Sequence, residues 1–329
     1  MTGLRETVAR AARHPAFKAA VSLLERLDRG RDGVLGVLTY HRVDSPSNEP
    51  DLYPGLISAE PRDFEDQMTL LSLRYRVISL EELLAVRQGA SLPRRAVMVT
   101  FDDAYKDFEE QAWPVLARLS LPATLFVPTD FPDRIDGGFW WDRLYAAFRR
   151  TGQSKSIIPS LGSASLLNPR ERRTAYDRLR EHTKTLPHDD AMETVEDTIR
   201  TLGVDSTENP VLTWDALRRL SRAGVTLAAH TQTHPLLTRV PPERAEAEVT
   251  GSILDLHREV GITPQAFAYP SGAVDETVAS VVKPLAPAAF TTERGLNDVA
   301  SMDWSRIRRI NVGSRSTSAL IRAQLLSWG

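Results

Sequence analysis

The 329-residue sequence contains no cysteine. This absence excludes disulfide bonds, thiolate metal ligands and a cysteine nucleophile, so any bound metal must be held by histidine and carboxylate side chains. The sequence also lacks a strong excess of either charge, because 41 basic and 43 acidic residues give a formal net charge of −2. The basic residues are spread along the chain, which argues against nucleic acid as a partner.

Long apolar runs are missing as well. No stretch approaches the roughly 20 apolar residues needed to span a bilayer, and the N-terminal residues lack the continuous apolar region of a secretory signal. We therefore expect a cytoplasmic protein. Residues 1–32 place Leu4, Val8, Phe17 and Val21 among Arg and Lys residues. This pattern predicts an amphipathic helical segment, either packed on its own domain or in peripheral contact with an anionic membrane surface. The oligomeric state is left open.

Short runs rich in β-branched and aromatic residues alternate with helical patterns along most of the chain. These runs are VLGVLTYH, YRVIS, AVMVTF, ATLFVP, VTLAAH, QAFAYP, AAFTT and IRRINV. This α/β alternation predicts a parallel sheet of seven or eight strands, closed or nearly closed into a TIM-like barrel built from residues 33–131 and 211–329.

Residues 132–210 interrupt this alternation of strand and helix patterns. They contain three helical patterns and no convincing strand, so we predict a mostly helical insertion. The Ser, Gly and Pro content of TGQSKSIIPSLGSASLLNP predicts a loop inside it. Because the segment follows the strand ATLFVP, we expect it at the end of the barrel where the strands terminate.

Polar side chains follow several predicted strands at the point where each strand ends. Asp102 and Asp103 follow the strand at 96–101, His230 and His234 follow the strand at 225–229, and His41 follows the strand at 35–40. The loops after the strands build the active face of a parallel α/β barrel. These residues are therefore the leading candidates for a functional site.

Two histidines and one carboxylate form a facial ligand set that leaves positions open for water and substrate, as in catalytic zinc and non-haem iron sites. An extended HTQTH segment would place its histidines about 13 Å apart, so the chain must turn immediately after His230. Of the two adjacent aspartates, one can bind the metal while the other takes a proton from water. Without a cation between them, the two carboxylates would repel each other and one of them would become protonated.

The motifs TFDDAYKD, HTQTH and FAYPSG, in this order and spacing, resemble those of the polysaccharide deacetylase family, the family 4 carbohydrate esterases with a NodB homology domain. The resemblance covers about residues 33–130 and 211–315. It implies a distorted (β/α) barrel and metal-dependent removal of N-acetyl groups from a carbohydrate substrate. By motif position it implies that Asp102 is the general base and that Asp103, His230 and His234 hold one divalent ion. Zinc is the expected ion, with cobalt, nickel or iron as alternatives.

The sequence departs from the family pattern at three places. Ala104 stands where a glycine usually follows the two aspartates, Gln265 stands where an arginine usually supports the base, and no histidine follows His257. The family normally takes its general acid from such a C-terminal histidine. In the branch that resembles the poly-N-acetylglucosamine deacetylases, a histidine at the end of an early strand takes this place, and His41 in LTYHRV matches it.

Five further residues are predicted to bind substrate. Tyr105, Tyr269 and Pro270 belong to the motifs, whereas Trp140 and Trp141 either stack on sugar rings or pack in the core. His14, His182 and His188 lie in polar segments and are predicted to be solvated.

The sequence leaves two alternatives to a sugar N-deacetylase. One is an amidohydrolase that removes a formyl or acyl group from a nucleotide-linked or lipid-linked sugar, which the expected cytoplasmic location favours. The other is a non-catalytic glycan-binding protein, which the glutamine at 265 and the missing C-terminal histidine favour.

Overall fold

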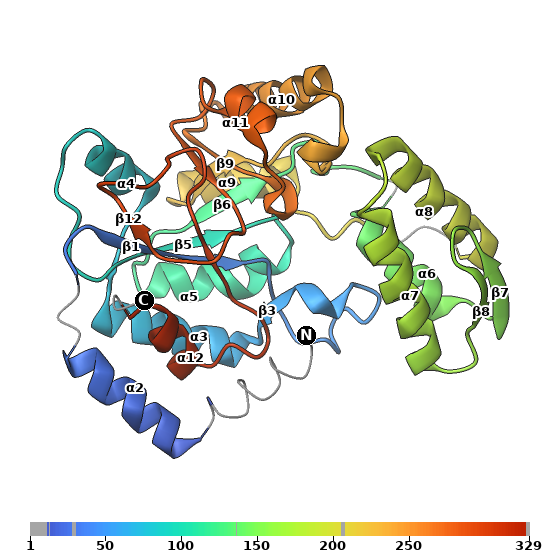
Figure 1. Cartoon of the computed structure of the whole chain (residues 1–329), viewed down its shortest axis with the longest axis horizontal. Helices are drawn as coiled ribbons and strands as arrows, with labels where there is room; N and C mark the ends of the chain where they lie inside the picture. The colour runs from blue at the N-terminus through green and yellow to red at the C-terminus, as the bar shows by residue number, and fades with distance from the viewer. Residues whose placement is uncertain (1–11, 13, 28–30, 136, 205–207, 327–329) are drawn as a thin grey trace.

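The computed structural model describes residues 12, 14–27, 31–135, 137–204 and 208–326 (Figure 1). Its centre is a nine-stranded sheet in the order β11-β10-β9-β6-β5-β1-β12, with β13 also paired to β1 and β4 to β5. The strands are β1 (Val34–Tyr40), β4 (Arg76–Val77), β5 (Ala96–Phe101), β6 (Thr124–Val127), β9 (Thr226–Ala229), β10 (Ala266–Ala268), β11 (Ala288–Phe290), β12 (Asn297–Asp298) and β13 (Ile310–Asn311). Two more short strands, β2 (Arg42–Val43) and β3 (Ile57–Ala59), pair with each other beside the sheet.

The sheet curls into a barrel. All pairings except that of β12 are parallel, as expected for strands joined by helices. The segment after β12 closes the gap between the two ends of the sheet, because Ile307 bridges Phe290 of β11 and Ile310 pairs with Leu38 of β1. The predicted α/β barrel is confirmed, and all eight strand-forming runs contribute a strand.

Side chains on both faces of the strands are buried, which explains the continuous apolar runs of the sequence. One set, which includes Leu35, Val37, Met98, Phe126 and Phe290, fills the barrel interior. The alternate set packs under the helices in the larger core cluster. This alternation fixes which residue at each strand end points to the barrel axis.

Helices surround the sheet (Figure 1). They are α3 (Pro61–Arg74), α4 (Leu80–Arg87), α5 (Trp113–Arg118), α9 (Trp214–Arg222), α10 (Pro242–Val260), α11 (Glu276–Val282) and α12 (Ser318–Gln324). Sequence signals set their ends: Ser79 and Glu82 form a capping box at α4, and Gly261 ends α10 in the left-handed conformation.

The segment at 132–210 forms a lobe beside the barrel (Figure 1, right). It contains α6 (Trp140–Arg150), α7 (Pro169–Thr183) and α8 (His188–Leu202), together with an antiparallel hairpin of β7 (Lys155–Ile158) and β8 (Gly162–Ser165). The prediction of a loop for TGQSKSIIPSLGSASLLNP is wrong, because this segment contains the hairpin. The hairpin escaped notice because its strands are short and largely exposed, with Ser160 and Gly162 making the turn at positive φ.

At the N-terminal end, the structure describes α2 (Pro15–Leu27) of the predicted amphipathic segment, whereas Leu4 and Val8 lie outside the described residues. Val21 and Glu25 of α2 are buried, and Glu25 forms an ion pair with Arg322 of α12. Leu23 and Leu27 remain exposed. Membrane contact stays a prediction. Within the described residues, no helix has the length and apolar character required to cross a bilayer.

Candidate metal centre and active-site pocket

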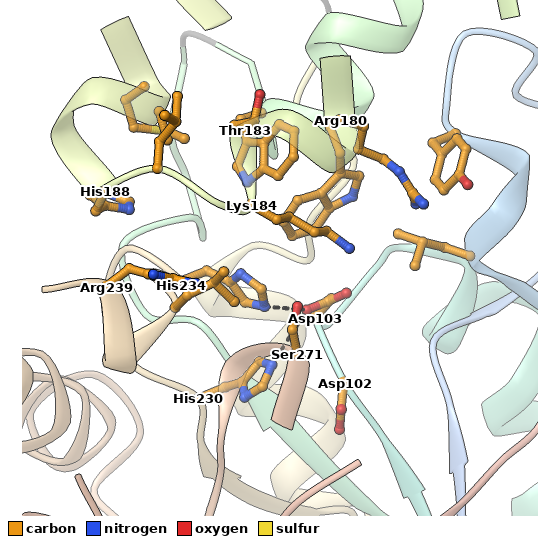
Figure 2. A pocket seen from close by; sticks show the side chains of 18 of the residues that line it. Asp102, Asp103, Arg180, Thr183, Lys184, His188, His230, His234, Arg239 and Ser271 are labelled. Atoms are coloured by element: carbon orange, nitrogen blue, oxygen red, sulfur yellow. Dashed lines mark ion pairs between the residues drawn. The ribbon is translucent and has the colours of Figure 1, made fainter. Parts of the chain in front are cut away.

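Asp103, His230 and His234 converge at the C-terminal ends of β5 and β9. The Asp103 Oδ1 atom lies 3.5 Å from Nε2 of His230 and 3.3 Å from Nε2 of His234. All three side chains are buried, and their candidate ligand atoms lie within 4.8 Å of one another. The sequence prediction that these three residues share one centre therefore matches their placement (Figure 2).

Unusual backbone conformations bring the three side chains together. Asp103 and Ala104 have φ values of 73° and 52°, and Thr231 and His234 have values of 66° and 58°. The chain thus turns immediately after His230, as the HTQTH spacing requires. Ala104 occupies the left-handed region that glycine tolerates best, at a cost of roughly 1–2 kcal/mol.

The donor set fits a divalent metal ion. Asp103 Oδ1 is buried and has no hydrogen-bond partner, which would be costly unless a cation accepted its lone pairs. The Nδ1 atom of His230 lies 2.6 Å from the carbonyl oxygen of Ala268. Because a carbonyl only accepts, Nδ1 carries the proton and Nε2 is left with a free lone pair. Burial lowers the pKa of His234, which favours the neutral imidazole that binds metals.

A carboxylate on α10 holds the HTQTH turn in place. Glu248 is buried and accepts hydrogen bonds from the backbone N–H groups of Gln232 and Thr233, at 2.9 and 2.8 Å, and from the Thr233 hydroxyl. Asp255 of the same helix accepts a bond from the Gln232 amide at 2.8 Å. These contacts hold the backbone between His230 and His234, and sequence reasoning missed Glu248 because it lies inside an ordinary helical pattern.

Asp102 is bound by Arg309, a residue that sequence reasoning also missed. Nη1 and Nη2 of Arg309 donate to the two carboxylate oxygens at 2.8 and 2.7 Å, and Arg309 Nε donates to the Thr291 carbonyl at 2.7 Å. Burial alone would raise the pKa of Asp102, but the Arg309 guanidinium holds it below the ordinary value. Gln265, at the usual arginine position, is exposed, and its side-chain amide donates to the Thr263 carbonyl rather than to Asp102. Arg309 therefore supplies from the β13 segment the support that Gln265 cannot give.

His41 lies next to Asp102 at the end of the neighbouring strand. β1 and β5 pair in the register Tyr40 to Phe101, and the Asp102 N–H donates to the Tyr40 carbonyl at 3.0 Å. His41 and Asp102 thus take matching positions, and both continue the sets of interior-facing residues. Neighbouring strands lie about 4.8 Å apart, and the two side chains line the same pocket.

The three candidate metal ligands open into a pocket. The barrel supplies its floor, and α6, α7 and α8 of the lobe supply much of its wall (Figure 2). Trp140 and Trp141 are part of this wall, although Trp141 is buried and its Nε1 donates to the Tyr105 hydroxyl at 2.9 Å. The mixture of apolar walls with a few convergent polar groups suits a small ligand or a sugar unit of a longer one.

Three of the predicted substrate contacts do not line the pocket. The Tyr105 hydroxyl donates to Asp142 at 2.6 Å inside the core, and the Tyr269 hydroxyl donates to the Ser305 carbonyl at 2.9 Å. Pro270 is also buried. These side chains already satisfy structural roles, so the predicted contacts are corrected: Ser271, next to Pro270, lines the pocket instead.

The prediction that His188 is solvated is wrong as well. His188 begins α8 and lines the pocket, together with Arg180 and Lys184 near the end of α7. Burial lowers the pKa of His188. Local sequence patterns around these residues are those of ordinary exposed helices, and only the packing of the lobe over the barrel brings them to the site.

Comparison with known proteins identifies the family. A model described as polysaccharide deacetylase matches residues 89–154 and 178–287, which make up more than half of the chain. The chain belongs to the polysaccharide deacetylase family.

Among individual family members, the chain is similar to two proteins named poly-beta-1,6-N-acetyl-D-glucosamine N-deacetylase. The one from Staphylococcus aureus is 33% identical over 105 residues, and the one from Staphylococcus epidermidis is 28% identical over 102 residues. Each match covers 28% of this chain and 35% of the relative. The chain thus spans about a third of the length of the curated relatives it matches.

Solved structures of the family share the fold over most of the chain. The Streptococcus pyogenes deacetylase PplD, solved with acetate, superposes with a TM-score of 0.60 at 19% identity and covers 90% of this chain and 99% of its own. IcaB from Ammonifex degensii gives a TM-score of 0.58 at 19% identity, covering 91% and 99%. At these identities the similarity establishes the NodB-type barrel fold.

Proposed function

We propose that this protein is a metal-dependent N-deacetylase, which hydrolyses N-acetyl groups of an N-acetylated sugar or polysaccharide. The observation that carries the proposal is the placement of a buried, arginine-bound carboxylate, Asp102, beside the Asp103, His230 and His234 cluster at the floor of one pocket. The names of the two Staphylococcus relatives support a β-1,6-linked N-acetylglucosamine polymer as a first substrate to test.

Asp103, His230 and His234 would hold the ion. When bound at such a site, a divalent ion lowers the pKa of a water and polarises a carbonyl group. The burial of all three residues limits competition from solvent.

Asp102 acts as the general base in this proposal. Its lowered pKa keeps the carboxylate ionised at neutral pH, and Arg309 holds both of its oxygens. In this proposal the carboxylate, which lines the pocket, accepts a proton from the attacking water. Water adds to the acetyl carbonyl carbon as Asp102 removes its proton. In this proposal a backbone N–H group of the 103–105 turn donates to the developing oxyanion.

His41 acts as the general acid. It donates a proton to the amide nitrogen as the carbon–nitrogen bond breaks, which releases acetate and the free amine of the sugar. Its place beside Asp102 supports this role, because both groups then face the same reacting centre from adjacent strands. The roles of His41 and Asp102 rest on this geometry and on the motif resemblance.

The rival of a non-catalytic glycan-binding protein drew its support from Gln265 and from the missing C-terminal histidine. Arg309 and His41 weaken both arguments, since each occupies the site from another part of the chain. A binding protein would also have no need of a buried Asp103 oxygen without a hydrogen-bond partner.

The test is acetate release from β-1,6-linked N-acetylglucosamine oligomers and from chitooligosaccharides by the purified chain supplied with zinc. The matched variant Asp102→Asn preserves volume and removes the base. The proposal expects acetate from the wild type and a loss of about 10²- to 10⁴-fold in the variant. Equal rates in the two proteins would refute it.

A further inference from the structure

Three basic side chains line the pocket in addition to the candidate metal ligands. Arg180 and Lys184 come from the last turn and C-terminal end of α7, and Arg239 ends the short 3₁₀ turn Leu237–Arg239 after the HTQTH segment. In Figure 2, Lys184 extends over Asp103 and His234, with Arg180 beyond it and Arg239 on the side of His234. The lobe and the barrel thus both bring positive charge to one cavity.

These cations are poorly neutralised by the protein. Within the described part of the chain, no carboxylate oxygen lies within 4.0 Å of the Lys184 amine or the Arg239 guanidinium. Arg180 Nη2 pairs with Glu181 at 2.6 Å, but its Nε is buried without a hydrogen-bond partner, and the guanidinium stacks 4.8 Å from the ring centroid of Tyr53. Arg180 nevertheless lines the pocket, where its guanidinium can meet a bound ligand.

The two aspartates that line the pocket have other partners than these three basic side chains. Asp102 is bound on both oxygens by Arg309, and Asp103 belongs to the candidate metal centre. Burial, followed by the charge of Arg180, lowers the pKa of Lys184. Keeping a partly buried cation beside another cation costs free energy unless an anion arrives to pair with it.

The geometry points to a substrate that carries an anionic group, a phosphate or a carboxylate, which Arg180 and Lys184 bind while the acyl amide lies over Asp102 and Asp103. This inference rests on the proposed function and narrows it, because a neutral N-acetylglucosamine polymer offers no charge for these side chains. Charge-assisted hydrogen bonds contribute about 1.5–3 kcal/mol each. One such bond corresponds to a preference of about 10-fold or more for the anionic sugar.

Equilibrium binding tests this subsite without turnover. The full chain is kept in chelator, so that a phosphate cannot bind through a metal ion. Binding is followed by tryptophan fluorescence, to which Trp140 and Trp141 in the pocket wall contribute, with calorimetry as a second readout. The probes are N-acetylglucosamine 1-phosphate, N-acetylmuramic acid and the neutral methyl glycoside of N-acetylglucosamine. We expect at least one anionic sugar to bind about 10-fold more tightly than the neutral one, and the tighter anion identifies phosphate or carboxylate as the preferred group.

Variants assign the preference to the basic residues. Lys184→Gln and Arg180→Gln should each reduce the preference, Lys184→Arg should retain most of it, and Lys155→Gln, on the exposed hairpin, should leave it unchanged. The inference is overturned if neutral and anionic sugars bind equally, or if the preference survives in both glutamine variants.

Acetate release from the same three sugars by the zinc-loaded enzyme separates this inference from the proposed function. Turnover without discrimination by charge would refute only the anionic subsite. Charge-dependent binding without any acetate would refute only the deacetylase activity.

Discussion

Replacing Arg309 with methionine should both destabilise the protein and change the pH at which its base works. Methionine keeps most of the side-chain volume but removes the guanidinium that binds Asp102. In the native protein, Arg309 is fully buried and Asp102 is 3% exposed. The variant therefore leaves a buried carboxylate without its countercharge.

The expected magnitude follows from the two short bonds of 2.7 and 2.8 Å. Removing one partner of a buried ion pair costs about 3–5 kcal/mol. Because the ionised carboxylate loses its countercharge while it stays buried, the pKa of Asp102 should rise in the variant. The pKa of the Asp102 carboxyl is lower in the folded protein than its ordinary value. The ion pair with Arg309 therefore stabilises the fold at pH values above the pKa of this carboxyl in the unfolded chain. This stabilisation is lost as the pH falls through the pKa of the carboxyl in the folded protein. The difference in stability between wild type and variant should thus be largest at pH 7 and narrow below about pH 4.

Urea denaturation at several pH values measures the stability difference, and the pH dependence of kcat/KM for acetate release measures the pKa. The acid limb of that profile should move upward in Arg309→Met. The matched control is Arg308→Met, because the Arg308 side chain is 52% exposed and pairs with the exposed Glu293. That control should cost less than about 1 kcal/mol. Equal destabilisation by the two substitutions, or an unmoved acid limb, would refute the role assigned to Arg309.

Three further predictions concern the rest of the site. His41→Gln should retain metal and fold but lose about 10²- to 10⁴-fold in kcat, and a near-normal kcat would show that another group is the acid. His234→Ala should abolish retention of zinc on gel filtration, measured as metal per chain, whereas His257→Ala on the exposed face of α10 should retain it; equal metal contents would disprove the ligand assignment. Glu248→Ala should weaken zinc affinity about 10- to 100-fold, because the HTQTH turn loses the carboxylate that holds it. The control Glu246→Ala, at an exposed position of the same helix, should leave zinc affinity unchanged. Unchanged affinity in Glu248→Ala would show that the turn keeps its shape without Glu248.

The barrel and the three-residue centre could be predicted because local patterns encode them. Buried parallel strands appear as apolar runs, and polar residues at strand ends meet at one face. His41 was a candidate by the same argument, because it ends a predicted strand, and the family resemblance suggested its role as the acid. The turn in HTQTH followed from bond lengths alone. Each of these inferences needed only the residue type and its distance from a strand end.

Other parts of the site depend on long-range packing that no local pattern reports. Arg309 reaches Asp102 across 207 positions in sequence, and its one signal was an arginine inside the strand-forming run IRRINV, where a buried charge demands a partner. Lys184 and Arg180 lie on a helix that looks solvent-exposed until the lobe is placed over the barrel. Tyr105 and Tyr269 misled because a motif position does not reveal whether a hydroxyl faces the pocket or a buried acceptor.

The most direct test of the account is a zinc titration of the metal-free chain, with acetate release from N-acetylglucosamine oligomers as the readout. We predict no acetate in the presence of chelator, activity that rises linearly to a plateau at about one zinc per chain, and no recovery in Asp103→Ala at any zinc concentration. Acetate release that survives chelation, or that is restored by zinc in Asp103→Ala, would contradict a deacetylase centred on Asp103, His230 and His234.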